Sequence, residues 1–301
     1  MAKCLVTGGA GFIGSHIVDA LIQKGHDVLV VDNLSTGKKE NINPRAKFFE
    51  NDLRDFDQVR PIFDGVDFVF HEAALPRIPL SIQKPKESND INIGGTLNAL
   101  IAAKEAGVKK FIYAASSSAY GAKNQLPLRE DMSCLPLNPY GLQKYVGELY
   151  CGVFSGIYGL KTVALRYFNV YGPRQPREGA YSPVIGIFLN QMASGEPLTI
   201  TGDGEQTRDF THVYDVARAN ILAMESEKVG SGEVINIGGG HNYSINAIAT
   251  LISGQTSHIP MPAGEMRDTL ADITRAKELL GWQPEITLEW GIKKLPENRD
   301  A

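Results

Sequence analysis

The chain has 301 residues, a net charge of −4 and hydrophobic residues at 43% of its positions, enough for one large domain or a domain with an added lobe. This acidic balance argues against nucleic acid or an anionic membrane as the main partner, and no apolar run approaches the ~20 residues of a membrane span. Three cysteines without paired spacing and six scattered histidines predict reduced thiols and no metal site. A strand pattern at Lys3–Thr7 leaves no room for a signal peptide, so we expect a cytoplasmic protein.

A glycine-rich turn follows this first predicted strand. Gly8–Gly14 reads Gly-Gly-Ala-Gly-Phe-Ile-Gly, and Ser15–Lys24 after it has helical periodicity. Gly8 and Gly11 let the backbone approach a pyrophosphate, while Gly14 allows helix and strand to pack closely, and the helix N-terminus faces the anion. The spacing differs by one residue from the commoner Gly-x-Gly-x-x-Gly, and a lone glycine cluster is usually only a turn. The strand before it and the helix after it favour a dinucleotide-binding site.

A second buried strand, Val28–Val31, ends at Asp32. This acidic residue stands about 20 residues beyond the glycines, where a carboxylate accepts hydrogen bonds from a ribose 2′-hydroxyl and repels a 2′-phosphate. The sequence therefore predicts NAD rather than NADP as the cofactor.

Strands and helices go on alternating through the first half of the chain. Strands are predicted at Ala46–Phe49, Val66–Phe70 and Lys110–Ala115, and helices at Phe56–Phe63 and around Gly94–Ala106. This alternation predicts an α/β fold with a doubly wound parallel sheet and helices on both faces. Ligands of such sheets bind at the carboxyl ends of the strands. The polar residues at these ends, which we expect on one rim, are Thr7, Asp32, Asp52, His71 and Ser116.

The segment Asn138–Lys144 reads Asn-Pro-Tyr-Gly-Leu-Gln-Lys. Pro139 suits the first position of a helix, which places Tyr140 and Lys144 one turn apart on one face. A tyrosine that acts as a base near pH 7 needs roughly 4 kcal/mol of stabilisation of its phenolate, and a nearby ammonium supplies part of it. The pair alone is a weak signal, because most such pairs are surface residues.

Three hydroxyls, Ser116–Ser118, follow the strand predicted at Lys110–Ala115. In isolation they indicate a polar turn. With Tyr140 on the next helix, a hydroxyl here can share or relay the proton that a tyrosine base removes from a substrate alcohol.

Taken together, these motifs resemble those of the extended short-chain dehydrogenase/reductases. The motifs that carry the resemblance are Thr7–Gly14, Asp32-Asn33, Asp52-Leu53, Ser116–Ser118 with Tyr120-Gly121 after them, and Tyr140 with Lys144. The second half looks like the UDP-hexose 4-epimerases of that group, through Leu165–Arg174, Gly202–Phe210 and Arg267–Asp272. The resemblance covers the chain from about Ala2 to about Pro284. It implies a Rossmann domain at residues 1–168, to which some later segments return, and a smaller α/β nucleotide-sugar-binding lobe at residues 169–301.

By this resemblance Tyr140 is the catalytic base, Lys144 binds the nicotinamide ribose and lowers the pKa of the phenol, and Ser116 is the accompanying hydroxyl. Ser117 is the alternative to Ser116, because the loop is one residue shorter than in many relatives. The implied NAD-binding residues are Gly8, Gly11, Phe12, Ile13, Gly14, Asp32, Asn33, Ser35, Thr36, Gly37, Asp52, Leu53, Ala73, Ala74, Asn92, Tyr140, Lys144 and Tyr167. The implied substrate-binding residues are Ser116, Ser117, Asn169, Ala180, Val184, Arg208, Arg267 and Thr269.

Two features of the second half bear on the substrate. The resemblance makes Arg208, with help from Arg267, a clamp on the nucleotide diphosphate, although a surface salt bridge is the simpler interpretation of Arg208. Many relatives carry a further arginine where this chain has Pro262. Thr269 stands where relatives limited to plain hexoses have tyrosine, and its small side chain removes a steric block. UDP-N-acetylglucosamine and UDP-N-acetylgalactosamine are therefore expected substrates beside UDP-glucose and UDP-galactose.

The implied reaction is reversible 4-epimerisation through a transient 4-keto sugar, with NAD regenerated in each cycle and kept bound. Related dehydratases and decarboxylases carry an acidic residue just after the catalytic hydroxyl, where this chain has Ser117 and Ser118. A 4-keto-sugar-nucleotide reductase and an epimerase of another nucleotide sugar are the alternatives, although Asp32 disfavours the NADPH that a reductase normally uses. A non-catalytic dinucleotide sensor would be expected to lose Tyr140, Lys144 or the serine.

The helices predicted around Gly94–Ala106 and at Tyr140–Tyr158 carry more apolar and aromatic residues than one packing face needs. These residues include Tyr145, Tyr150, Val153 and Phe154. They can simply belong to the core. Relatives pair these two helices with their copies, so the resemblance implies a homodimer with a four-helix contact.

Overall fold

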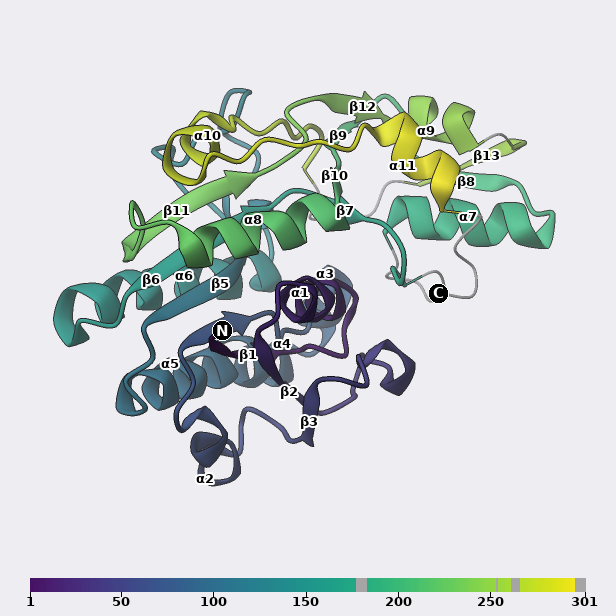
Figure 1. Ribbon diagram of the computed structural model, residues 1–301. Coiled ribbons are helices and arrows are strands. Elements are labelled where there is room, and N and C mark those ends of the chain that lie inside the picture. The colour runs from purple at the N-terminus through teal and green to yellow at the C-terminus, as the bar shows by residue number, and fades with distance from the viewer. Residues whose placement is uncertain (177–182, 253, 261–265, 296–301) are drawn as a thin grey trace.

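A seven-stranded sheet forms the centre of the computed structural model, which describes residues 1–176, 183–252, 254–260 and 266–295 (Figure 1). The strand order is β11-β6-β5-β4-β1-β2-β3, and every neighbouring pair is parallel. The strands are β1 Lys3–Thr7, β2 Asp27–Asp32, β3 Lys47–Glu50, β4 Phe68–His71, β5 Lys110–Ser116, β6 Thr162–Tyr167 and β11 Ser231–Ile237. The predicted doubly wound parallel sheet is confirmed, and the chain reverses its direction of progress between β1 and β4, where such sheets bind ligands.

Helices cover both faces of this sheet and enclose two apolar cores. One core lies under α1 Phe12–Gln23, α8 Val213–Glu225 and α10 Thr274–Leu280. The other lies under α2 Phe56–Val59, α5 Gly95–Glu105 and α6 Pro139–Tyr158. Because both faces are covered, the strands are near-continuous apolar runs rather than alternating ones, and all seven residues of β5 are buried.

The helix that carries the tyrosine and lysine pair begins where the sequence predicts. Asn138 caps it by accepting a hydrogen bond from the backbone N–H of Gly141 at 2.9 Å, and Pro139 is its first residue. Gly159 ends it in a left-handed conformation with φ of 69°. The helix predicted around Gly94–Ala106 is α5, and a π-helical turn at Asp90–Gly94 precedes it. Two short helices, α3 Ile78–Gln83 and α4 Pro85–Asn89, lead into that turn.

A smaller α/β lobe is built from the second half of the chain and extends to the right of the sheet in Figure 1. Its helices α7 Val184–Ser194, α9 Ile245–Ile252 and α11 Leu288–Lys294 share one apolar core. Its short strands pair as β7 Val170–Tyr171 with β10 Thr211–His212, β8 Leu198–Thr201 with β13 Thr256–Ile259, and β9 Thr207–Asp209 with β12 Asn242–Ser244. Three elements from beyond residue 168, namely β11, α8 and α10, return to the sheet layers.

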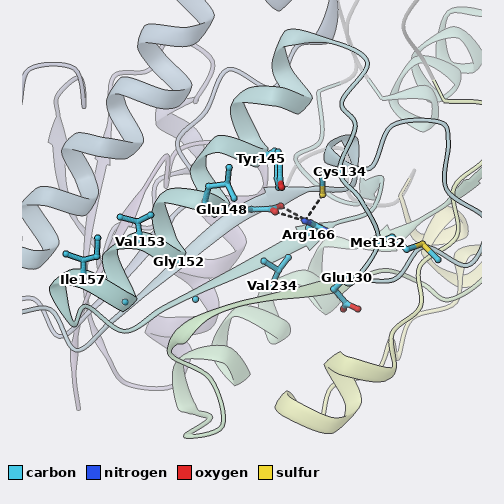
Figure 2. Close-up of a pocket in the computed structure, with 13 residues that line it drawn as sticks. Glu130, Met132, Cys134, Tyr145, Glu148, Gly152, Val153, Ile157, Arg166 and Val234 are labelled. Atoms are coloured by element: carbon cyan, nitrogen blue, oxygen red, sulfur yellow. Dashed lines mark hydrogen bonds and ion pairs between the residues drawn. The ribbon is translucent and has the colours of Figure 1, made fainter.

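A groove of about 570 Å³ runs along α6, between that helix and β11 (Figure 2). Arg166 and Glu148 form a buried ion pair at its base, with 2.6 Å between Nη2 and Oε2. Among the described residues, the third guanidinium nitrogen, Nη1, has no hydrogen-bond partner, and the guanidinium carbon lies 4.5 Å from the centre of the Tyr120 ring. The pair is therefore stabilised by short charge-assisted bonds but is incompletely satisfied.

The outer side of α6 carries a stripe of exposed apolar residues. Leu142, Leu149, Val153 and Ile157 repeat at helical spacing and are between 44% and 72% exposed. Phe154, which the sequence had placed among the candidate contact residues, instead belongs to the core, because its position on the helix turns it toward the sheet. Within the part of the chain that the structure describes, no helix is both long and apolar enough to cross a bilayer.

Candidate active site

The carboxyl ends of the central strands bring the predicted polar residues to one rim. Strand register places Thr7 beside His71, and Ser116 beside Tyr167. The Thr7 hydroxyl lies 2.8 Å from Nδ1 of His71, and the other ring nitrogen lies 2.9 Å from the hydroxyl of Thr96. Burial lowers the pKa of His71 to about 3, so the ring is neutral. His71 therefore joins the strand end to α5 and does not serve as an acid.

The glycine turn leaves a cradle at the N-terminus of α1. Gly8 has a φ of 72°, and a Cβ there would lie 2.7 Å from the backbone nitrogen of Ala73. A Cβ on Gly14 would overlap the carbonyl oxygen of Gly8. Gly11 caps the helix without a side-chain hydrogen bond, and the first turn holds no acidic residue. The backbone N–H groups of the first turn of α1 therefore have no side-chain acceptor. Together with the close approach of the backbone at the glycines, they fit a pyrophosphate, so the residues present suit a dinucleotide.

Asp32 holds the loop beside this cradle together. One carboxylate oxygen accepts from the backbone N–H of Leu34 at 2.8 Å, and the other accepts from Ala10 at 3.0 Å. Gly37 approaches so closely that a Cβ would lie 2.8 Å from the Asp32 carboxylate. Each oxygen keeps a further acceptor position, which is what a ribose hydroxyl needs. Burial raises the pKa of Asp32, whose carboxylate is partly compensated by those two backbone bonds.

Asp52 and Leu53 follow β3 on the same rim. The Asn33 amide donates to Asp52 at 2.8 Å, and Arg54 binds the same carboxylate through two nitrogens, which holds its pKa well below the usual range. Leu53 is buried and packs in the core under α5. Ser35 donates its backbone N–H to the Asn33 side chain. Asn33, Asp52 and Leu53 thus border the surface that the sequence assigns to the adenosine half of NAD.

Asn92 ties the loop after β4 to the tyrosine helix. Its side-chain oxygen accepts from the backbone N–H of Leu75 at 2.7 Å, and its nitrogen donates to Gln143 at 2.8 Å. Asn92 is buried and lies in the π-helical turn. Such a turn holds one residue more than an α-helical turn, and here the Asn92 side chain points toward this loop. The loop contains Ala73 and Ala74, so the arrangement holds their backbone against the glycine cradle.

Tyr140, Ser116 and Lys144 meet at the end of β5. Ser116 is close enough to the Tyr140 hydroxyl to lower the pKa of that phenol, and the Ser116 oxygen accepts from the backbone N–H of Ser118 at 3.2 Å. This proximity favours Ser116 over Ser117, so Ser116 stays the predicted hydroxyl beside the tyrosine. Lys144 is buried and donates from Nζ to the carbonyl of Ala114 at 2.8 Å.

The protonation balance of this group differs from the expectation that Lys144 lowers the pKa of Tyr140. Burial, together with the negative charge of Glu72, raises the pKa of Tyr140 to about 12, although the hydrogen bond from Ser116 opposes the rise. Burial also lowers the pKa of Lys144 to about 8, against the attraction of nearby carboxylates. Without its cofactor, the site therefore holds Tyr140 as a neutral phenol at pH 7.

Sequence reasoning missed two residues of the site, Glu72 and Asn220, which both contact the predicted Tyr167. Tyr167 donates its hydroxyl proton to Glu72 at 2.9 Å, and the Asn220 amide on α8 donates to the Tyr167 oxygen at 2.8 Å. Glu72 directly follows β4, so the rule that placed His71 on the rim could also have singled it out. Asn220 gave no such signal, because only the packing of α8 across the sheet brings it to Tyr167.

On the lobe side, Asn169, Asp209 and Thr269 form one cluster. Asn169 has a φ of 27° and donates from its amide to the Asp209 carbonyl at 2.8 Å. The Thr269 hydroxyl accepts from the Asp209 backbone N–H at 3.1 Å and lies 3.3 Å from the Asn169 amide. Thr269 is also buried. Its hydroxyl therefore helps to position Asn169.

The two arginines assigned to the diphosphate lie next to each other. Arg208 donates from Nη1 to the backbone carbonyl of Arg267 at 2.8 Å, and Arg267 is itself paired with Asp203 at 3.0 Å. Val184 is the half-buried first residue of α7. Ala180 and Pro262 lie outside the described residues.

The parallel sheet, the open glycine cradle and the tyrosine, serine and lysine at the strand ends define a dinucleotide-binding enzyme of the extended short-chain dehydrogenase/reductase type. Within that class, the chain belongs to the NAD dependent epimerase/dehydratase family, which matches residues 4–238.

Individual relatives agree with this assignment along nearly their whole lengths. A protein of Methanocaldococcus jannaschii named as a putative UDP-glucose 4-epimerase is 44% identical over 299 residues, covering 97% of this chain and 96% of its own. The crystal structure of UDP-glucose 4-epimerase from Thermotoga maritima with UDP-glucose superposes with a TM-score of 0.95 at 43% identity, covering 98% of both chains. UDP-N-acetylglucosamine 4-epimerase from Methanobrevibacter ruminantium, in complex with UDP-N-acetylmuramic acid, gives a TM-score of 0.93 at 39% identity, covering 99% of this chain and 97% of its own.

Proposed function

We propose that this protein is an NAD-dependent isomerase that reversibly inverts C4 of a UDP-hexose through a transient 4-keto intermediate. The observation that carries the proposal is the placement of Tyr140 near Ser116, one helical turn from Lys144 and at the same rim as the glycine cradle. Relatives named as 4-epimerases of UDP-glucose and of UDP-N-acetylglucosamine support the same reaction.

Each residue of this group has a distinct task in the proposed reaction. Tyr140, as phenolate, takes the proton of the sugar 4-hydroxyl and returns it after the keto sugar has turned over. Ser116 shares that proton through its hydrogen bond to Tyr140. Lys144 supplies the positive charge of the site and is held in place by the Ala114 carbonyl. NAD, bound by the glycine cradle and Asp32, supplies the hydride acceptor and donor.

The substrate is held from the lobe in this proposal. Arg208 and Arg267 meet the diphosphate, and Asn169 meets the sugar nucleotide, so the diphosphate stays bound while the keto sugar rotates. Thr269 leaves room for an N-acetyl group at C2, so both plain and N-acetylated hexoses are proposed substrates. Ser117 and Ser118 bring no carboxylate next to Ser116, which favours reversal of the oxidation over dehydration or decarboxylation.

We expect the purified protein to interconvert the C4 epimers of UDP-glucose and of UDP-N-acetylglucosamine without added NAD, because the cofactor is regenerated and stays bound. NMR of the sugar anomeric protons measures both reactions. Conversion of UDP-glucose alone would contradict the proposal that Thr269 leaves room for an N-acetyl group at C2. Absence of conversion with either sugar, even with NAD added, would contradict the epimerase and favour the 4-keto reductase or another nucleotide sugar.

We also propose a homodimer in which α6 packs against its copy, and the cytoplasm as its location. The exposed apolar stripe of Leu142, Leu149, Val153 and Ile157 supports the contact, since a monomer rarely exposes so many apolar residues on one helix. The helix α5, expected to share this contact, carries no large exposed apolar side chain in its described length, so α6 contributes most of the apolar surface. The three cysteines are free thiols, which suits a reducing compartment.

The stripe gives a direct test of the dimer. Replacing Leu149 and Val153 together by lysine places charges in the proposed contact, so we expect a monomer at micromolar concentration by light scattering. Trp290→Lys, at a similarly exposed position on α11, is the matched control and should remain dimeric. A monomeric wild type, or a dimeric double variant, would rule this interface out.

A further inference from the structure

Asp209 is a fully buried carboxylate at the end of β9. Its Oδ1 accepts a hydrogen bond from the backbone N–H of Gly239 at 2.5 Å. Its Oδ2 accepts from the backbone N–H groups of Gly240 at 3.1 Å and of Ala271 at 2.9 Å. The carboxylate therefore joins β9 to the loop after β11 and to the segment that carries Thr269.

The glycines of this loop allow the close approach to the carboxylate. A Cβ on Gly239 would lie 3.0 Å from Oδ1 of Asp209 and 2.5 Å from the backbone oxygen of Phe210. A Cβ on Gly238 would lie 3.0 Å from Oδ2 of Asp209. Gly240 has a φ of 72°, which residues with a side chain rarely adopt. The run of three glycines is thus shaped to receive the Asp209 side chain.

The backbone of Asp209 holds two of the proposed substrate contacts. Its carbonyl oxygen accepts from the Asn169 amide at 2.8 Å, and its N–H donates to the Thr269 hydroxyl at 3.1 Å. The preceding residue, Arg208, donates to the backbone carbonyl of Arg267 at 2.8 Å. A shift of Asp209 would therefore move groups assigned to the sugar nucleotide and groups assigned to its diphosphate.

The charge of Asp209 strengthens these backbone bonds, because a carboxylate is a stronger acceptor than a neutral oxygen. Burial raises the pKa of Asp209 to about 7, and the three backbone hydrogen bonds oppose that rise. At pH 8 the carboxylate is therefore the main form.

We propose that Asp209 is a positioning residue of the nucleotide-sugar site. Its carboxylate anchors β9 to the glycine loop and to the segment around Ala271, and this anchor aligns the groups proposed to hold the substrate, namely Arg208, Asn169 and Thr269. The inference rests on the proposed function, which assigns those three residues to the substrate. Asp209 touches none of the reacting atoms, so it acts on binding of the nucleotide and not on hydride transfer.

Asp209→Asn tests this role, because it keeps the size of the side chain but replaces one acceptor oxygen by an NH2 group that opposes the backbone donors. Asp215→Asn is the matched control. Asp215 on α8 is also a buried carboxylate, and it accepts from the backbone N–H groups of Glu285 and Ile286 at 3.1 and 3.0 Å. It pairs with Arg218 as well, so its substitution should disturb the fold at least as much. In the described part of the chain it has no hydrogen bond to the proposed substrate residues.

UDP binding is measured at pH 8 by titration calorimetry, beside urea unfolding, the content of bound NAD, and KM and kcat for UDP-glucose. We expect Asp209→Asn to weaken UDP binding and raise KM by about tenfold, the effect of losing one charge-assisted hydrogen bond, with kcat within about twofold of the wild type. Asp215→Asn should keep the wild-type UDP affinity and KM even where its unfolding midpoint is lowered. Both variants should keep NAD, because the glycine cradle lies at the N-terminus of α1.

Thr269→Val decides the matter should Asp209→Asn fail to fold. It leaves the carboxylate and its three bonds in place and removes the hydroxyl that joins Asp209 to Asn169. UDP carries no hexose, so the expected loss of UDP affinity, about threefold, reports on alignment and not on room for the C2 substituent.

Wild-type UDP affinity in Asp209→Asn, or in Thr269→Val where Asp209→Asn does not fold, would overturn the proposal. A loss confined to kcat, or an equal loss of UDP affinity in Asp215→Asn, would also overturn it. Failure of the proposed function is distinguishable because it is measured on the wild-type protein, which would then convert no UDP-sugar, whatever the variants do to UDP binding.

Discussion

Replacing Tyr140 by phenylalanine is expected to lower the rate of epimerisation by about 10³-fold while NAD remains bound. The phenylalanine ring fills the same half-buried space, so the loss comes from the missing oxygen that exchanges a proton with the sugar 4-hydroxyl. The Ser116 hydroxyl loses its interaction with the phenol at the same time but keeps the hydrogen bond from the Ser118 backbone. Turnover of UDP-glucose by NMR, with the bound NAD measured after denaturation of the protein, checks both parts of the expectation.

Tyr145→Phe is the matched control for this variant. Tyr145 lies on the same helix and lines the groove between α6 and β11 instead of the rim. It should therefore keep nearly the wild-type rate. If Tyr140→Phe turned over UDP-glucose at a similar rate to Tyr145→Phe, the tyrosine would not be the base. If Tyr140→Phe lost its NAD, the rate alone would not report on proton transfer, and the comparison would have to be made at saturating NAD.

Replacing Arg166 by methionine is expected to lower the free energy of unfolding by about 4 kcal/mol, because it leaves the carboxylate of Glu148 buried without a partner. In the wild type the two side chains are almost fully buried and joined by two hydrogen bonds (Figure 2). Removing both charges is a different change. The double variant Arg166→Met with Glu148→Leu should recover most of the loss, since an apolar pair of similar volume carries no desolvation penalty. Urea unfolding of the three proteins gives the comparison.

The loss should also depend on pH. Burial raises the pKa of Glu148 even beside Arg166, and removal of the guanidinium raises it further. A carboxyl whose folded-state pKa lies above its unfolded value of about 4.3 takes up a proton on folding. Its contribution to the free energy of unfolding is therefore present at low pH and is lost as the pH rises toward the folded-state pKa. Arg166→Met should therefore differ least from the wild type at acid pH. A double variant as unstable as the single one would show that the charge pair is not the cause.

Much of the architecture was predictable because it follows from local patterns. The apolar runs at β1 and β2, the glycines between β1 and α1, and Asn138-Pro139 before Tyr140 each specify a local structure through backbone sterics and capping. The strand-end rule then placed Thr7, Asp32, His71 and Ser116 on one rim without any coordinates. The bounds of the helix at Gly94–Ala106 were less certain, because the π-helical turn before α5 continues the same periodicity.

The sequence by itself determined the fold class, the cofactor class and the tyrosine, serine and lysine group, because short-range spacing on strands and helices decides which side chains share a face or a rim. Only the tertiary structure decided the electrostatics of that group. The packing of α8 across the sheet places Asn220 against Tyr167 and Tyr167 against Glu72, and Arg166 on β6 pairs with Glu148 on α6. Charge effects depend on distance and burial across elements far apart in the chain, and no local pattern encodes them.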